Sequence, residues 1–277
     1  MEFQTLFFDV RDTAEPGWGT EILLPFLERN SQAVAELREL GRPESRWVRI
    51  DPDPTYYTKL EGLYALSRIV DILVAPFQPV NNDRALLAIN ADHPWWEGPL
   101  PSADAWRPFG AALGGVAVSE ERFHPFFHEI VSVQRADDPD EPPSLVDEYW
   151  PGLLVGSLVL VRSGVAVRAG IKVMDPFVAS TSCLYWSWWR RNRVVRDESH
   201  GWRQNSQWGT DFRRDYVVDG ELYYNVDWIG RERSGPRRED VTDVELNLLL
   251  RYRCSLKRDL GDDHYPFKES LVERSAQ

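Results

Sequence analysis

Cysteine and lysine are both scarce in this chain of 277 residues. The only two cysteines, Cys183 and Cys254, lie far apart and form no Cys-x-x-Cys pair, so neither a zinc knuckle nor a dithiol redox centre is expected. We interpret both as reduced core residues. None of the lysines follows an acidic residue at a spacing of two, which excludes the strand motif with which restriction-type nucleases hold a metal-bound phosphate.

Long apolar segments are missing as well. The most apolar window, residues 153–173, is interrupted by Arg162, Arg168 and Lys172, charges that are costly at the centre of a bilayer. The N-terminus has no basic region followed by an apolar stretch, the pattern typical of a secretion signal. We therefore expect a soluble, cytoplasmic protein without a membrane partner.

Motifs of catalysis are equally sparse. The glycines of 110–115 lack the Lys and Ser/Thr of a phosphate-binding loop, and no Gly-x-Ser-x-Gly presents a nucleophile. The sequence therefore predicts neither a cofactor nor an enzyme.

Acidic residues, in contrast, are abundant and unevenly distributed. The formal net charge is −12; residues 1–150 hold 12 Lys and Arg against 26 Asp and Glu, whereas residues 151–277 hold 20 against 18. Such a surface repels nucleic acid and attracts basic proteins, although simple solubility is an equally good explanation.

Hydrophobic periodicity predicts an α+β protein. In the N-terminal half, an α/β-like layer is expected, with strands at 3–10 and 47–50 alternating with amphipathic helices at 21–40 and 57–74. Thr20 is placed to cap the first of these helices and Gly41 to end it.

The C-terminal half is expected to be mainly antiparallel sheet. Short apolar runs predict strands at 127–135, a meander of 159–161, 165–167 and 171–173, a hairpin around Asp219-Gly220, and a strand at 244–254. The segment 136–143 combines four acids with three prolines and is interpreted as a linker between subdomains 1–135 and 144–277.

One group of residues has the spacing of a metal site. His124 and His128 lie four apart with Glu129 beside them, so a helix would place both imidazoles on one face. Pro125 and the β-rich run that follows argue against a helix there. We treat a metal-dependent hydrolase based on these three residues as the alternative function, and predict no metal.

Two aromatic clusters are candidates for recognition. Trp95, Trp96 and Glu97 fall in a Pro- and Gly-rich stretch, and Trp186, Trp188 and Trp189 are interleaved with arginines. Aromatic and arginine side chains are frequent in protein interfaces and can stack on bases, but buried strand residues would have the same composition.

Short motifs suggest a family. The sequences His93-Pro-Trp-Trp-Glu97-Gly-Pro and Pro16-Gly17-Trp18, in a Trp-rich α+β chain, resemble bacterial immunity proteins of polymorphic toxin systems, and among them the immunity protein fifty-two family. The resemblance covers the N-terminal half. It implies cytoplasmic neutralisation of a cognate toxin, a nuclease of the restriction-endonuclease fold, such as one delivered by type VI secretion.

We therefore expect an immunity protein that binds a basic nuclease toxin directly, without contacting nucleic acid, and blocks its active or assembly surface. The oligomeric state stays open, with a homodimer or a larger scaffold as alternatives. The expected partner-binding residues comprise the two aromatic clusters and the acids of the linker: Trp95, Trp96, Glu97, Asp137, Asp138, Asp140, Glu141, Trp186, Trp188 and Trp189.

Overall fold

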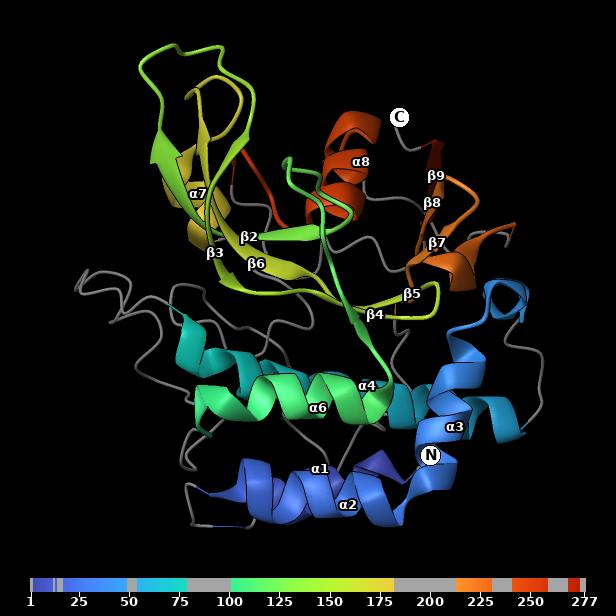
Figure 1. The fold of residues 1–277 in the computed structure, drawn as a ribbon. Coiled ribbons are helices and arrows are strands. Elements are labelled where there is room, and N and C mark those ends of the chain that lie inside the picture. The colour runs from blue at the N-terminus through green and yellow to red at the C-terminus, as the bar shows by residue number, and fades with distance from the viewer. Residues whose placement is uncertain are drawn as a thin grey trace.

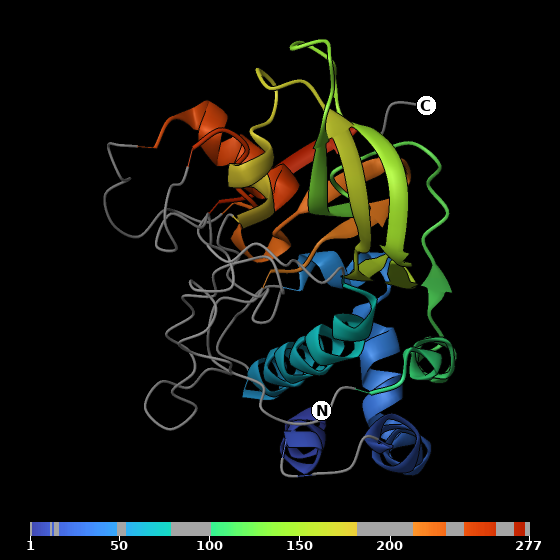
Figure 2. The same ribbon diagram turned by 90° about the vertical axis from the view of Figure 1, so that its left-hand side faces the viewer.

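The fold consists of a layer of helices beneath two β-sheets (Figure 1). The layer holds α1 (Phe3–Arg11), α2 (Leu24–Arg29), α4 (Pro54–Val74) and α6 (Trp106–Leu113), and a view from the side shows the same arrangement (Figure 2). The computed structural model describes residues 2–11, 13, 17–48, 54–78, 101–181, 213–230, 241–258 and 269–274.

The first segment of the chain is a helix, so the strand predicted for 3–10 is wrong. Phe3, Leu6, Phe7 and Val10 are all fully buried, and their spacing of three and four places them on one face of α1. A short apolar run has no reliable period, and here the contact of α1 with α4 selects the helix.

The helix predicted for 21–40 is present but divided. A π-helical turn (Gly19–Leu23) leads into α2, and Asn30 separates α2 from α3 (Ser31–Leu40). Gly41 follows the last residue as predicted, whereas Trp18, rather than Thr20, precedes the first turn. The next segment, Pro43–Trp47, is a 3-10 helix, so the predicted strand does not begin at Trp47.

The second predicted helix is confirmed as α4. Its buried residues include Leu63, Leu66, Ile69 and Leu73, and it continues into the 3-10 turn Ala75–Phe77. Another 3-10 turn, Ala103–Ala105, leads into α6. Among the helices described here, none combines the length and the apolarity needed to cross a membrane.

The strands form two sheets. In the three-stranded sheet, β6 (Ser163–Ala169) lies between β2 (His128–Arg135), which is parallel to it, and β3 (Ser144–Trp150), which is antiparallel. The six-stranded sheet has the order β1-β4-β5-β7-β8-β9, with strands Val116–Ala117, Leu153–Val155, Leu158–Val161, Tyr216–Val218, Glu221–Tyr224 and Leu271–Arg274.

The strand prediction for 127–135 is therefore confirmed, but the predicted meander is wrong. Residues 159–161 lie in β5 and 165–167 in β6, which belong to different sheets, and residues 171–173 form a turn. Ser163 and Gly164 start β6 instead of turning the chain. Periodicity indicates that a segment is extended but not which strand pairs with it.

The hairpin at Asp219-Gly220 is confirmed between β7 and β8. Both turn residues have positive φ angles, 51° and 76°, as a two-residue hairpin turn of this kind requires.

The strand predicted for 244–254 is wrong, because Asp243–Tyr252 forms helix α8. Thr242 accepts a hydrogen bond from the Glu245 amide, and the Glu245 carboxylate accepts one from the Thr242 amide. This capping box stabilises the first turn of a helix, and the Thr-x-x-Glu signal was present in the sequence.

The α+β class with a sheet-rich C-terminal half is confirmed. The main core contains residues of α1, α4 and α6 together with Val131, Trp150, Leu158 and Tyr216 of the sheets. Residues 136–143 join β2 to β3, the two outer strands of the three-stranded sheet, so they connect strands on either side of β6 and not separate sheets. The division of the chain into subdomains 1–135 and 144–277 stays a prediction.

Candidate functional site

The connection between β2 and β3, residues 136–143, is a projecting surface feature that we call the acidic tip. It stands away from the helical layer at the far end of the three-stranded sheet (Figure 1). Asp137, Asp138 and Asp140 are exposed, and Glu141 is partly exposed. These are four of the ten residues that the sequence predicts to bind a partner.

The acidic tip is held by backbone hydrogen bonds to the turn that follows β6. The Gly170 amide donates to the Glu141 carbonyl at 2.9 Å, and the Lys172 amide donates to the Pro139 carbonyl at 3.0 Å. The Ala136 amide donates to the Ala169 carbonyl, also at 2.9 Å. The acidic tip, which the sequence analysis interpreted as a linker, therefore has a backbone that is fixed by hydrogen bonds.

Gly170 is required for this close approach. A Cβ atom at this position would lie 2.3 Å from the Pro139 carbonyl oxygen and 2.6 Å from that of Asp138. Any side chain would thus displace the acidic tip or the turn beneath it.

Two basic side chains partly neutralise the acidic tip. The Arg168 guanidinium lies 3.2 Å from the Glu141 carboxylate and 3.9 Å from that of Asp137, and the Lys172 ammonium lies 2.8 Å from Asp140. Four acids against these two bases leave an excess of two negative charges. Exposed ion pairs of this type contribute about 0–1 kcal/mol each, so the carboxylates stay available to a partner.

Both tryptophan clusters lie outside the described residues. They are Trp95, Trp96 and Glu97, and Trp186, Trp188 and Trp189. Trp18 of the Pro-Gly-Trp motif is fully buried in the main core, where it packs as a structural residue. Trp47, which the sequence analysis did not select, is 52% exposed and lies against the Arg46 guanidinium.

His124, His128 and Glu129 do not form a metal site. His128 and Glu129 are neighbours in β2, and consecutive strand residues point to opposite faces of a sheet. Nδ1 of His128 accepts a hydrogen bond from the His124 amide at 3.0 Å, and Nδ1 of His124 accepts one from the Phe126 amide at 3.1 Å. No group of three potential ligands for a metal occurs in the part of the chain that the structure describes.

Burial also affects these two imidazoles. It lowers the pKa of His124 and of His128, against the nearby Glu120 carboxylate, which raises both. The rings of His128 and Phe123 are stacked, with centroids 5.8 Å apart. The pair is therefore interpreted as a packed, uncharged part of the structure at neutral pH.

A network of buried arginines was missed by the sequence analysis. Asp215 accepts hydrogen bonds from Arg162 at 2.9 Å and from Arg213 at 2.7 Å, with no more than 3% of any of these side chains exposed. Asp227 pairs with Arg214 at 2.6 Å, equally buried. The signal available was the run Arg213-Arg214-Asp215 immediately before β7.

This network joins separate parts of the fold. Arg162 donates to the carbonyl of Arg251, and Arg213 to that of Leu250, so both satisfy the C-terminal end of α8. Arg214 donates to the carbonyls of Ser45 and Val48, in the segment between α3 and α4. The network is therefore a structural cross-link rather than a surface for a partner.

Burial and neighbouring charges shift the pKa values of Asp215 and Arg162 in the network. Burial alone would raise the pKa of Asp215, but Arg213, Arg162 and Arg253 together lower it below its ordinary value. Burial, together with repulsion from Arg253 and Arg213, lowers the pKa of Arg162 to about 9.

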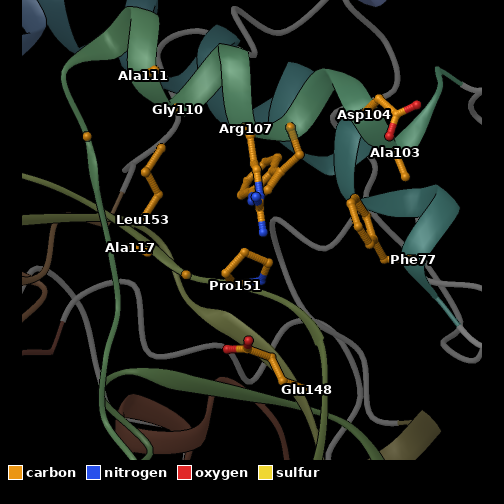
Figure 3. A pocket seen from close by; sticks show the side chains of 13 residues that line it. Phe77, Ala103, Asp104, Arg107, Gly110, Ala111, Ala117, Glu148, Pro151 and Leu153 are labelled. Atoms are coloured by element: carbon orange, nitrogen blue, oxygen red, sulfur yellow. The ribbon is translucent and has the colours of Figure 1, made fainter.

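A cleft of about 870 Å³ lies between α6 and the segment that joins β3 to β4 (Figure 3). Arg107 projects from α6 toward Pro151, and Glu148 of β3 lies on the opposite side. Phe77, Trp106 and Leu153 form apolar parts of the wall. The sequence analysis did not anticipate this cleft, because its walls come from segments that are far apart in the chain.

No protein-family model matches the chain, and comparison with curated proteins and with solved structures finds no similar protein.

Proposed function

We propose that the protein acts by binding a basic partner protein through the acidic tip. The single observation that supports this function most directly is an exposed group of carboxylates on a backbone fixed by hydrogen bonds to the turn after β6. A surface that is already ordered loses little conformational entropy when it binds, so more of the interaction energy appears as affinity.

Charge supports the same proposal. The protein as a whole carries −12, and the acidic tip adds a local excess of negative charge at its extremity. A field of this sign increases the rate of encounter with a positively charged protein, and it disfavours direct contact with nucleic acid.

The partner class that we propose is a nuclease toxin, with the present protein as its cytoplasmic immunity protein. Enzymes that cleave nucleic acid present basic surfaces to the phosphate backbone, and a projecting acidic element can occupy such a surface. The motifs Pro16-Gly17-Trp18 and Trp95-Trp96-Glu97 support this class by their resemblance to toxin-immunity proteins.

The proposal is tested by co-expression with the product of the neighbouring gene, followed by affinity capture and a plasmid-cleavage assay. We expect a stable complex and protection of the plasmid. The informative variant replaces all four acids of the acidic tip by their amides: Asp137→Asn, Asp138→Asn, Asp140→Asn and Glu141→Gln. It should bind at least about tenfold more weakly, because buried or central charge pairs contribute most to such interfaces.

A charge-matched control separates local from global electrostatics. Replacing four exposed acids elsewhere by Gln changes the net charge equally, from −12 to −8, and should leave binding within about twofold of the unmodified protein; these are Glu2, Glu28, Glu120 and Glu121. Equal losses of affinity for the partner in both variants would contradict a specific role of the acidic tip. Absence of any complex and of plasmid protection would overturn the immunity function.

A further inference from the structure

The cleft beneath α6 contains two charged side chains that no described residue neutralises. Among the described residues, neither the Arg107 guanidinium nor the Glu148 carboxylate makes a hydrogen bond or an ion pair. The third charged residue of the wall, Asp104, keeps its negative charge, but its carboxylate is engaged locally, since it accepts a hydrogen bond from the Ser102 hydroxyl. Arg107 and Glu148 are therefore the positive and the negative group of the wall for which the described residues supply no partner.

These two groups are on opposite walls. Arg107 belongs to α6 and Glu148 to β3, and the Arg107 side chain extends across the space toward the strand segment that carries Glu148 (Figure 3). The space between them is bordered by apolar side chains, including Phe77, Pro151 and Leu153. Apolar walls with a few polar groups that fix orientation are typical of sites for small ligands.

The charges restrict the ligand. A dianion would be repelled by Glu148, and a dication by Arg107, whereas a molecule with one charge of each sign at its two ends satisfies both walls. A volume of about 870 Å³ is in the upper part of the range of ligand clefts, so it suits a short peptide better than a single amino acid.

We propose that this cleft binds a short zwitterionic peptide with apolar side chains. The C-terminal carboxylate pairs with Arg107, the N-terminal ammonium pairs with Glu148, and the side chains pack against the apolar wall. Arginine can hold a carboxylate through two parallel hydrogen bonds, which gives this end of the ligand a defined orientation. This inference does not depend on the acidic tip or on its partner.

The test uses the dipeptide Leu-Phe and three derivatives with the same side chains, titrated calorimetrically into the full-length protein. One derivative is N-acetylated, one is C-amidated and one carries both modifications. We expect Leu-Phe to bind most tightly and each modification to weaken binding by about tenfold, as expected when a charge-assisted hydrogen bond is lost.

Two variants assign each end of the peptide to its side chain. Arg107→Gln should bind the free and the amidated C-terminus equally, while it still distinguishes the free from the acetylated N-terminus. Glu148→Gln should bind peptides with a free and an acetylated N-terminus equally, while it still distinguishes the free from the amidated C-terminus. Both residues are exposed, so neither substitution disturbs the core. Matched controls are Arg122→Gln and Glu121→Gln, exposed residues outside the cleft, which should behave as the unmodified protein.

A third variant tests the position of the site. Ala111 is exposed and borders the cleft, so Ala111→Trp should obstruct it and abolish binding while the circular dichroism spectrum stays unchanged. The proposal is overturned if none of the four peptides binds at millimolar concentration. It is equally overturned if binding is indifferent to Ala111→Trp, or if Arg107→Gln leaves the preference for the free carboxylate intact.

Discussion

The acidic tip and the buried arginine network contain the same kinds of ion pair in opposite surroundings. At the acidic tip, Lys172 and Asp140 are each more than 60% exposed and their charges are screened by water. In the network, Arg162 and Asp215 are almost inaccessible, and each charge depends on its partner. The same chemistry therefore leaves charge accessible to solvent in one region and links separate elements of the fold in the other.

The consequence of this difference is an unequal tolerance to mutation. An exposed carboxylate that loses its charge is solvated by water, whereas a buried arginine that loses its carboxylate remains charged in a medium of low polarity. Stability should thus be sensitive to the charges of the network and insensitive to those of the acidic tip, while partner affinity should show the reverse.

The largest effect is expected for Asp215→Asn. The substitution keeps the shape of the side chain but leaves the Arg162 and Arg213 guanidinium groups without a counter-charge, and it weakens the bond from the Asn225 amide. We expect a loss of about 3–5 kcal/mol in the free energy of unfolding, measured by urea denaturation. Asp140→Asn at the acidic tip is the matched control and should cost less than about 1 kcal/mol. Similar losses in the two variants would contradict the comparison.

The dependence of stability on pH should report the same network. Because the pKa of Asp215 is lower in the folded than in the unfolded chain, its carboxylate contributes stability above about pH 3.9, and this contribution is lost as the pH falls through the folded pKa. The lowered pKa values of His124 and His128 affect stability at a higher pH than the carboxylate of Asp215 does. Their contribution is present above about pH 6.5 and decreases on acidification below it.

We therefore expect two successive decreases in the free energy of unfolding between pH 7.5 and pH 3. Asp215→Asn should reduce the second decrease, and His128→Gln the first, in urea denaturation repeated across this range. A pH profile of Asp215→Asn that runs parallel to that of the unmodified protein would argue against a charged Asp215 in the folded state.

The sequence predicted features that depend on residues close together in the chain, but not contacts between distant segments. The helix α4, the stop at Gly41 and the Asp219-Gly220 hairpin depend on neighbouring residues, and all three are confirmed. The acids of 136–143, which the sequence predicts to bind a partner, are exposed or partly exposed, and their binding role stays a prediction. Their composition suits a linker and an ordered connection equally well, so the hydrogen bonds from Gly170 and Lys172 were not predictable.

The errors arise where two patterns compete or where partners are distant in the chain. In α8, alternating leucines imitate a strand, and the capping box at Thr242 was overlooked. Arg162 meets Asp215 only because β5 and β7 are neighbours in the six-stranded sheet, and no spacing in the sequence encodes that contact. The cleft is similarly non-local, because Arg107 and Glu148 belong to different elements.

Gly170→Ala should lower the free energy of unfolding by an amount between those expected for Asp215→Asn and for the exposed charges of the acidic tip. The added methyl group would collide with the backbone of Pro139 and Asp138, so the acidic tip must move and lose its hydrogen bonds to the turn. We expect a loss of about 1–3 kcal/mol in the free energy of unfolding, typical of overpacking, together with weaker binding to the partner. Unchanged affinity in a destabilised variant would indicate that the fixed backbone of the acidic tip is not needed for recognition.

The smallest effect on stability, and the sharpest test of the comparison, is expected for Lys172→Gln. Lys172 is 63% exposed, so the loss of its pair with Asp140 should change the free energy of unfolding by less than about 0.5 kcal/mol. The same substitution removes the positive charge that compensates Asp140. It should therefore increase the association rate with the basic partner on the order of twofold at low salt. The control is Arg29→Gln on α2, which alters the net charge by the same amount on the exposed surface of the helical layer. If stopped-flow measurements show equal accelerations for both variants, the total charge of the protein, and not the acidic tip, guides the encounter.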